Sequence, residues 1–174
     1  MNARVQFLWT ACKSPKWDSK AIMWWEGTPY SHIAVAIYEP VRFILDGKAL
    51  DFPNGCIIHA DDPGVVPISF EEFFKTRKAI ARKTVELHTN ASGFQGYCQR
   101  AIGKGLYSDG QLIAIGARVK VLRPLFSNGR AKSICSELGG DILVDLAGVK
   151  LKGDPDFDWT PKYLFGVLEP EPVS

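Results

Sequence analysis

The chain has 174 residues and a net charge of +2, with 46% apolar and 23% charged residues. This length suits one domain with its own hydrophobic core, so we expect a single domain over residues 1–174. Because the charge is small and no run of Lys and Arg exceeds two residues, we expect no nucleic-acid partner. The first apolar run is short and soon interrupted by Lys13 and Pro15, so the sequence predicts neither a signal peptide nor a transmembrane segment, and we expect a cytoplasmic protein.

The four cysteines lie far apart in the chain, at Cys12, Cys56, Cys98 and Cys135. None forms a Cys-x-x-Cys pair, so the sequence predicts neither a zinc site nor a thioredoxin-type redox site. A cytoplasmic location also argues against structural disulfides. We therefore expect no metal and no cofactor, and we assign one thiol to catalysis and three to structure.

The first half of the chain has mostly the pattern of strands. Apolar runs rich in β-branched and aromatic residues predict strands over residues 4–11, 30–38, 56–60, 65–68 and 83–88. Asp46-Gly47 predicts the turn of a hairpin over residues 41–50. The run at 30–38 is almost continuously apolar, so we expect a central strand covered on both faces. Pro67 instead places its strand near an edge of the sheet.

Helices are expected mainly in the second half. An earlier helix is capped near Asp18 and Ser19, and Ser69 with Glu72 forms a capping box for another. Later helices are expected over residues 91–102, over 109–118, and from Cys135 to near Gly148. The basic stretch at 117–132 is predicted to be a loop that acts as a lid or substrate lip. Strands followed by helices predict an α+β fold.

Cys135 stands at the start of an amphipathic helix. Apolar residues follow it at +3, +7, +8 and +11, which is the spacing of one buried helix face. Ser133 is a good N-cap, so Cys135 is expected in the first turn, where unpaired N–H groups and the helix dipole favour a thiolate. That position suits a nucleophile. The alternative is a buried structural thiol, since free cysteines are often buried.

Of the three histidines, His32 lies at the start of the predicted central strand, where an imidazole can face a cleft and take a proton from a thiol. His59 ends a neighbouring strand and could orient His32 through a ring nitrogen. His88 has no evident partner. The alternative for His32 is a core or rim histidine held by the backbone.

Five segments, in chain order, carry a resemblance to a known family. They are residues 17–22 with 27–35, residues 57–60 with 64–68 and 71–73, and residues 105–109, 135–138 and 160–161. They include GTPYSH at 27–32 and CSEL at 135–138. Together they resemble the circularly permuted NlpC-type papain-like cysteine peptidases, the YiiX-like group, over roughly residues 4–168. The histidine precedes the cysteine, which is the permuted order.

This resemblance implies an α+β, papain-like fold: an antiparallel sheet or partial barrel packed against helices, with the nucleophile at a helix N-terminus. It implies Cys135 as nucleophile, His32 as base and His59 as the orienting group. Asp51 is an alternative third residue, because a predicted hairpin lengthens the span between the two histidines. The resemblance also suggests a bacterial or phage origin.

The activity implied is that of a cysteine hydrolase, a peptidase or amidase that forms an acyl-enzyme on a peptide or acyl substrate, with cell-wall peptides as one class. The oxyanion would be held by the backbone N–H of Cys135, with the hydroxyl of Tyr107 or Tyr30 as further candidates. For Tyr107, a packed tyrosine with its hydroxyl at the surface is an equal alternative.

Two other functions fit the same residues. A lipid acyltransferase or thioesterase-like enzyme would resemble the lecithin retinol acyltransferase branch, which also uses a His–His–Cys set. Trp24, Trp25 and the phenylalanines at 70, 73 and 74 would then meet acyl chains, although such stripes are usually core. A non-catalytic binding module on the same fold is the other alternative. A lowered thiol pKa at Cys135 would favour the enzymes over the binding module.

Overall fold

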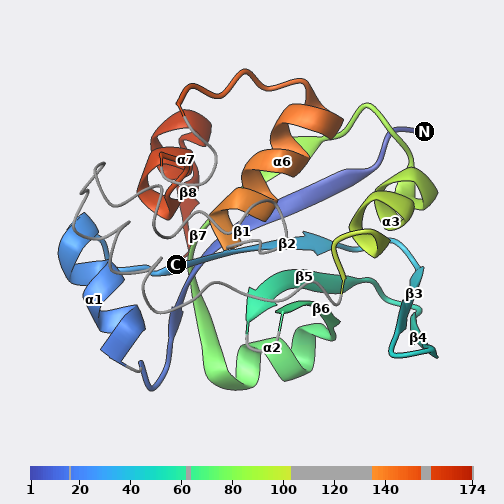
Figure 1. Cartoon of the computed structure of the whole chain (residues 1–174), viewed down its shortest axis with the longest axis horizontal. Helices are drawn as coiled ribbons and strands as arrows, with labels where there is room; N and C mark the ends of the chain where they lie inside the picture. Colours follow the sequence, from blue (N-terminus) through green and yellow to red (C-terminus); the bar gives the residue numbers. More distant parts are fainter. Residues whose placement is uncertain (16, 62–63, 103–134, 154–157, 174) are drawn as a thin grey trace, which may run out of the picture.

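The computed structural model describes residues 1–15, 17–61, 64–102, 135–153 and 158–173. These residues form an α+β fold built on a largely antiparallel sheet (Figure 1). Six strands follow one another across the main sheet in the order β6-β5-β2-β1-β7-β8, and β3 pairs with β4 in a separate hairpin. The predicted helix at 109–118, the basic loop at 117–132 and the N-cap Ser133 lie outside the described residues.

The strands are β1 (Arg4–Cys12), β2 (His32–Ile37), β3 (Val41–Leu45), β4 (Lys48–Phe52), β5 (Cys56–Asp61), β6 (Gly64–Ile68), β7 (Arg77–Glu86) and β8 (Glu171–Pro172). The helices in the described ranges are α1 (Trp17–Glu26), α2 (Phe70–Thr76), α3 (Ala91–Gln99), α6 (Cys135–Ala147) and α7 (Pro161–Leu168). The predicted α+β class is confirmed. In these ranges, no helix is both long enough and apolar enough to span a membrane.

Strand β2 is the predicted central strand, and the structure confirms it. It lies between β1 and β5, and all of its residues are buried. A strand covered on both faces needs apolar residues at nearly every position, which the sequence HIAVAI provides. The edge position of β6 is confirmed as well. Asp46 and Gly47 both have a positive φ, as the two-residue turn of the β3–β4 hairpin requires.

Part of β7 and all of α7 were not predicted from the sequence. β7 begins at Arg77 rather than at residue 83, because its basic first half lacks clean alternation and is held by antiparallel pairing with β1. In α7, the N-cap Thr160 accepts a hydrogen bond from the backbone N–H of Tyr163 at 3.2 Å, and Pro161 occupies the first turn. The apolar run that follows is too short to separate a helical period from a strand.

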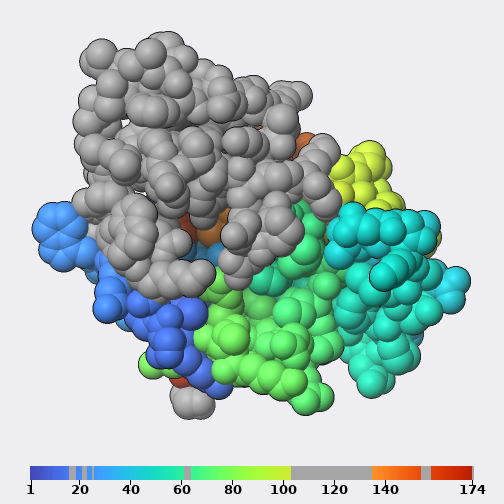
Figure 2. Space-filling model, turned by 60° about the horizontal axis from the view of Figure 1, so that its bottom comes forward, coloured from blue at the N-terminus to red at the C-terminus, as the bar shows by residue number. Residues whose placement is uncertain are grey.

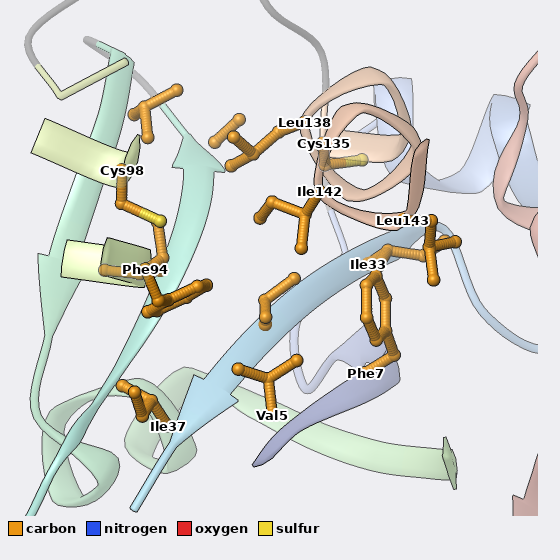
Figure 3. Packing of buried hydrophobic residues seen from close by; sticks show 14 of the residues in the cluster. Val5, Phe7, Ile33, Ile37, Phe94, Cys98, Cys135, Leu138, Ile142 and Leu143 are labelled. Carbon is orange, nitrogen blue, oxygen red and sulfur yellow. The ribbon is translucent and has the colours of Figure 1, made fainter. Parts of the chain in front are cut away.

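Two hydrophobic clusters cover the main sheet, one on each face. α6 and α7 lie on one side of the sheet and α2 lies on the other (Figure 1). The larger cluster packs α6 against alternate residues of β1 and β2, such as Phe7 and Ile33 (Figure 3). The smaller cluster packs Phe73 of α2 against intervening residues, such as Leu8 and Ala34. Successive strand residues point to opposite faces, so each face of β2 has its own helical partner.

Two glycines allow α6 to pack closely. A Cβ at Gly139 would stand 3.4 Å from Cγ2 of Ile33, and a Cβ at Gly140 would overlap the ring of Trp159. Larger residues at these positions would push the helix away from β2 or displace the ring. Gly139 therefore lies in contact with β2, and Gly140 leaves room for the ring of Trp159.

Replacing Gly140 by alanine is expected to lower the free energy of unfolding by about 1–3 kcal/mol, because the new methyl group displaces the buried Trp159 ring. Gly96 of α3 has open space around it, so Gly96→Ala is the matched control. It should raise that free energy by about 0.5–1 kcal/mol through helix propensity. Urea unfolding measures both. Wild-type stability of Gly140→Ala would contradict this packing.

Candidate active site

His32 and His59 lie together on the face of the sheet that carries α2. Their ring centroids are 5.5 Å apart, and the ring planes stand at 83°. The His59 ring in turn meets the ring of Phe73, at 5.2 Å and 79°. Both histidines are buried, with only 6% and 5% of their surface exposed. The structure therefore brings the two predicted histidines into ring contact.

The histidines stand where the sheet opens between β2 and β5. The pairing of these strands runs only from Val35 with Ile58 to Ile37 with Cys56. His32 precedes this paired stretch on β2, and His59 follows it on β5, where β5 continues to pair with β6. The end of β2 that carries His32 thus has a side that β5 does not cover. An opening of this kind gives a side chain from another element access to the strand.

Cys135 is the first residue of α6, and its sulfur reaches that end of β2. Backbone hydrogen bonds from Ile33 and Ser136 act on the thiol, and Ile33 directly follows His32. No hydrogen bond joins Cys135 to His32 within the described residues. Figure 3 shows Cys135 at the end of α6 above Ile33 of β2. Figure 2, which brings the α2 side forward, shows a small orange area of α6 above the blue N-terminal part of the chain.

Buried polar atoms without a hydrogen-bond partner gather at the same place. Among the described residues, they include Oγ1 of Thr10, Oγ of Ser31, Nε2 of His32 and Oγ of Ser136. Thr10 is the cross-strand neighbour of His32, and the two serines flank His32 and Cys135 in the sequence. An unsatisfied buried polar group costs about 1–3 kcal/mol, so a cluster of them marks a site kept for a purpose other than stability.

The thiol of Cys135 is protonated at neutral pH. Burial raises its pKa to about 11, although the backbone hydrogen bonds from Ile33 and Ser136 and the charge of Arg77 act to lower it. The charge of Glu26 adds to the increase. This is the opposite of the lowered pKa expected from the helix start, because the desolvation of a 6% exposed thiol outweighs the N-terminal field of α6.

The imidazole of His32 is neutral. Burial holds its pKa well below its usual value, and the positive charges of Arg77 and of a protonated His59 act in the same direction. A neutral imidazole is the form that can accept a proton. The thiol of Cys135 and the imidazole of His32 are therefore both neutral at rest and do not form a thiolate–imidazolium pair.

Tyr30 and Tyr107 are the two tyrosine candidates for stabilising an oxyanion. Tyr107 lies outside the described residues. Tyr30 is 4% exposed and stacks in parallel on Phe165, with ring centroids 5.1 Å apart. Burial, together with the charge of Glu26, raises the pKa of Tyr30 to about 12, so its hydroxyl keeps its proton and can donate a hydrogen bond.

Asp51, the alternative third residue, is on the β3–β4 hairpin, where its carboxylate is paired with the guanidinium of Arg42. Both side chains are largely exposed, at 59% and 65%. The hairpin follows the end of β2 opposite to His32 (Figure 1). Of the two candidates for orienting the base, the structure places His59 beside His32 and Asp51 in this exposed ion pair.

Arg77 is a site residue that the sequence analysis did not identify. It caps the C-terminus of α2 and begins β7. Its guanidinium carbon lies 5.9 Å from the ring centroid of Phe73, the same ring that His59 contacts. Its charge acts on both His32 and Cys135. The one available sequence signal was the i, i+4 spacing of Phe73 and Arg77, which aligns a cation with an aromatic ring at a helix end.

Alkylation of Cys135 by iodoacetamide is expected to accelerate steadily from pH 7 to beyond pH 10. The thiolate is the reacting form, and its fraction rises about tenfold per pH unit below a pKa of about 11. Peptide mass spectrometry follows the modification of this thiol. In urea-unfolded protein the rate should level off near the free-cysteine pKa of about 8.5. A plateau at or below pH 8 in the folded protein would contradict the neutral thiol.

The stability of the folded protein is expected to fall as the pH drops below 6.5. The buried, neutral His32 binds a proton less readily than the same residue in the unfolded chain, so acid favours unfolding. Between pH 7 and pH 5 the wild type should lose about 1–2 kcal/mol that His32→Gln does not lose. Urea unfolding at each pH measures the difference. Parallel pH profiles for the two proteins would contradict it.

No protein-family model matches the chain, and no curated protein matches it. In the part of the chain that the structure describes, no group of three or more His, Cys, Asp and Glu side chains is arranged to hold a metal ion. The basis for a functional proposal is therefore the group formed by Cys135, His32, His59 and Arg77 at one end of the main sheet.

Proposed function

We propose that the protein is a cysteine hydrolase in which Cys135 attacks an acyl carbon and His32 is the base. One observation carries this proposal: the Cys135 sulfur is hydrogen-bonded by the backbone of Ile33, the residue next to His32. The contact between the His32 and His59 rings supports His59 as the group that orients the base. A thiol, an imidazole and a second imidazole so arranged suit acyl transfer.

The reaction starts from neutral groups. As the Cys135 sulfur bonds to the acyl carbon, its proton passes to His32, which becomes an imidazolium. Collapse of the tetrahedral intermediate breaks the bond to the leaving nitrogen or oxygen, which takes that proton. Water then attacks the thioester, His32 again accepts and returns a proton, and the acid and the free thiol are released. Nucleophile–base contacts are often long without substrate and shorten in the reacting complex.

The oxyanion of the tetrahedral intermediate would form beside the start of α6. The first N–H groups of a helix have no intrahelical partner, so they can donate to that oxygen. The backbone N–H of Cys135 is the first candidate donor. The protonated hydroxyl of Tyr30 is a further candidate donor. The hydroxyl of Tyr107, proposed from the sequence, is another.

The proposed fold is the permuted papain-like one, with the histidine strand before the cysteine helix. An antiparallel sheet with Cys135 at a helix N-terminus supports it. The proposed substrates are peptides or acyl compounds. The lipid alternative gains little support from Phe73, which is 1% exposed, although Trp24 is 79% exposed.

Incubation with 4-nitrophenyl acetate is expected to add one acetyl group to Cys135, with release of nitrophenol in proportion to enzyme. Cys135→Ala should abolish the adduct, and His32→Ala should slow its formation by about 100-fold or more, the usual contribution of a general base. Intact-protein and peptide mass spectrometry locate the acetyl group, and absorbance follows nitrophenol.

His88→Ala is the matched control, because His88 lies against Gly148 beyond the other end of α6 and should leave the acylation rate unchanged. An acetyl group found on Cys12 instead of Cys135, or equal rates for wild type and His32→Ala, would refute the hydrolase and leave the binding module. A peptide substrate panel then separates peptidase from esterase.

A further inference from the structure

We propose that Thr10 is a positioning residue for His32, because its hydroxyl oxygen accepts a hydrogen bond from the Nε2–H of the imidazole. This inference rests on the proposed hydrolase function, since it concerns the base of that reaction. It adds to the role of His59, which the ring contact supports. A hydrogen bond at Nε2 leaves Nδ1 of His32 to exchange a proton with Cys135.

Thr10 and His32 face each other across two neighbouring strands. Thr10 of β1 is the antiparallel partner of His32 of β2, so their side chains stand on the same face of the sheet. Two residues further along, Leu8 pairs with Ala34 on this face, and both belong to the smaller hydrophobic cluster. The Cβ atoms of directly opposed residues lie about 4.5–5.5 Å apart. At that spacing a hydroxyl can reach an imidazole nitrogen after a small rotation of either side chain.

Both atoms of the proposed hydrogen bond are buried. Thr10 is 0% exposed and His32 is 6% exposed. Within the described ranges, neither Oγ1 of Thr10 nor Nε2 of His32 has a hydrogen-bond partner. A buried polar group without a partner costs free energy, and a hydroxyl oxygen can accept from an imidazole N–H. One hydrogen bond between these two residues therefore satisfies both groups.

The backbone at Thr10 is irregular on the side away from His32. The pairing of β1 with β7 shifts by one residue between Trp9 and Thr10, whereas the pairing of β1 with β2 continues in register. Such β-bulges are common beside active sites, where they change the direction of a side chain. The imidazole of His32 is thus flanked by Thr10 on β1 and by His59 on β5.

The proposed reaction is what gives the Thr10 hydroxyl its importance. His32 becomes an imidazolium during acylation and again during deacylation, and burial is the main cause that disfavours this charge. An imidazolium donates from both ring nitrogens, so its buried Nε2–H needs an acceptor. Hydrogen bonds to charged groups are stronger than those between neutral groups. The Thr10 oxygen therefore stabilises the charged form of His32 more than the resting form, as catalysis requires.

Single-turnover reaction with 4-nitrophenyl acetate tests the inference. In Thr10→Val, the acylation of Cys135 and the decay of the acetyl-enzyme should both be about 10- to 100-fold slower, the effect of losing a hydrogen bond to a charged group. The substrate concentration for half-maximal acylation should change little. Thr10→Ser keeps the hydroxyl and should stay near the wild-type rates. Absorbance of nitrophenol follows acylation, and intact-protein mass spectrometry follows loss of the acetyl group.

Thr10→Val is expected to fold, because it removes a buried hydroxyl that has no hydrogen-bond partner in the described part of the chain. Urea unfolding verifies this. Thr84→Val is the matched control, since Thr84 pairs with Gln6 on the same face of the sheet but away from His32. It should leave both rates unchanged.

In a His32→Ala background, Thr10→Val should have no further effect, because the two residues act through one imidazole. Wild-type rates in folded Thr10→Val, equal slowing in both backgrounds, or a Thr10→Ser protein as slow as Thr10→Val would overturn the role of Thr10 alone. Acylation of Cys135 in His32→Ala as fast as in the wild type would overturn the hydrolase proposal as well.

Discussion

The close packing of α6 against β2 is the contact on which the candidate site depends. Gly139 faces Ile33 across this contact, and the backbone of Ile33 also holds the sulfur of Cys135. One residue thus supports the helix through its side chain and the thiol through its backbone. Because strand residues alternate between faces, the preceding residue, His32, points to the α2 side. The candidate site therefore lies at the end of a strand that passes between the two hydrophobic clusters.

Burial decides the charge state of this site. A helix N-terminus alone favours a thiolate, and exposed reactive cysteines use that effect. Here the desolvation of both Cys135 and His32 is larger, and each group keeps the neutral form that burial favours. Cys135 and His32 would become charged only during the proposed reaction, when a bound substrate supplies a new interaction partner.

Much of the frame was predictable because its signals are local. The apolar run of β2, the Asp46-Gly47 turn and the N-cap at Ser69 each depend on a few adjacent residues, and all three are confirmed. The contact between His32 and His59 depends on tertiary packing, which the spacing of these residues in the sequence does not determine. Arg77 was missed for the same reason, because its importance comes from register with β1 and from the ring of Phe73. The raised thiol pKa depends on depth of burial, which a helix pattern does not reveal.

The burial of Cys135 also affects how readily oxidants react with its thiol. The thiolate is the form that peroxides attack, and it is scarce in the folded state because of the raised pKa. In the unfolded chain the same thiol has an ordinary pKa of about 8.5 and full exposure. Its partners on β2 come from residues about one hundred positions earlier in the chain, so this protection arises only once α6 has docked. Oxidative damage at Cys135 would thus record time spent unfolded, because native packing protects this thiol from oxidation.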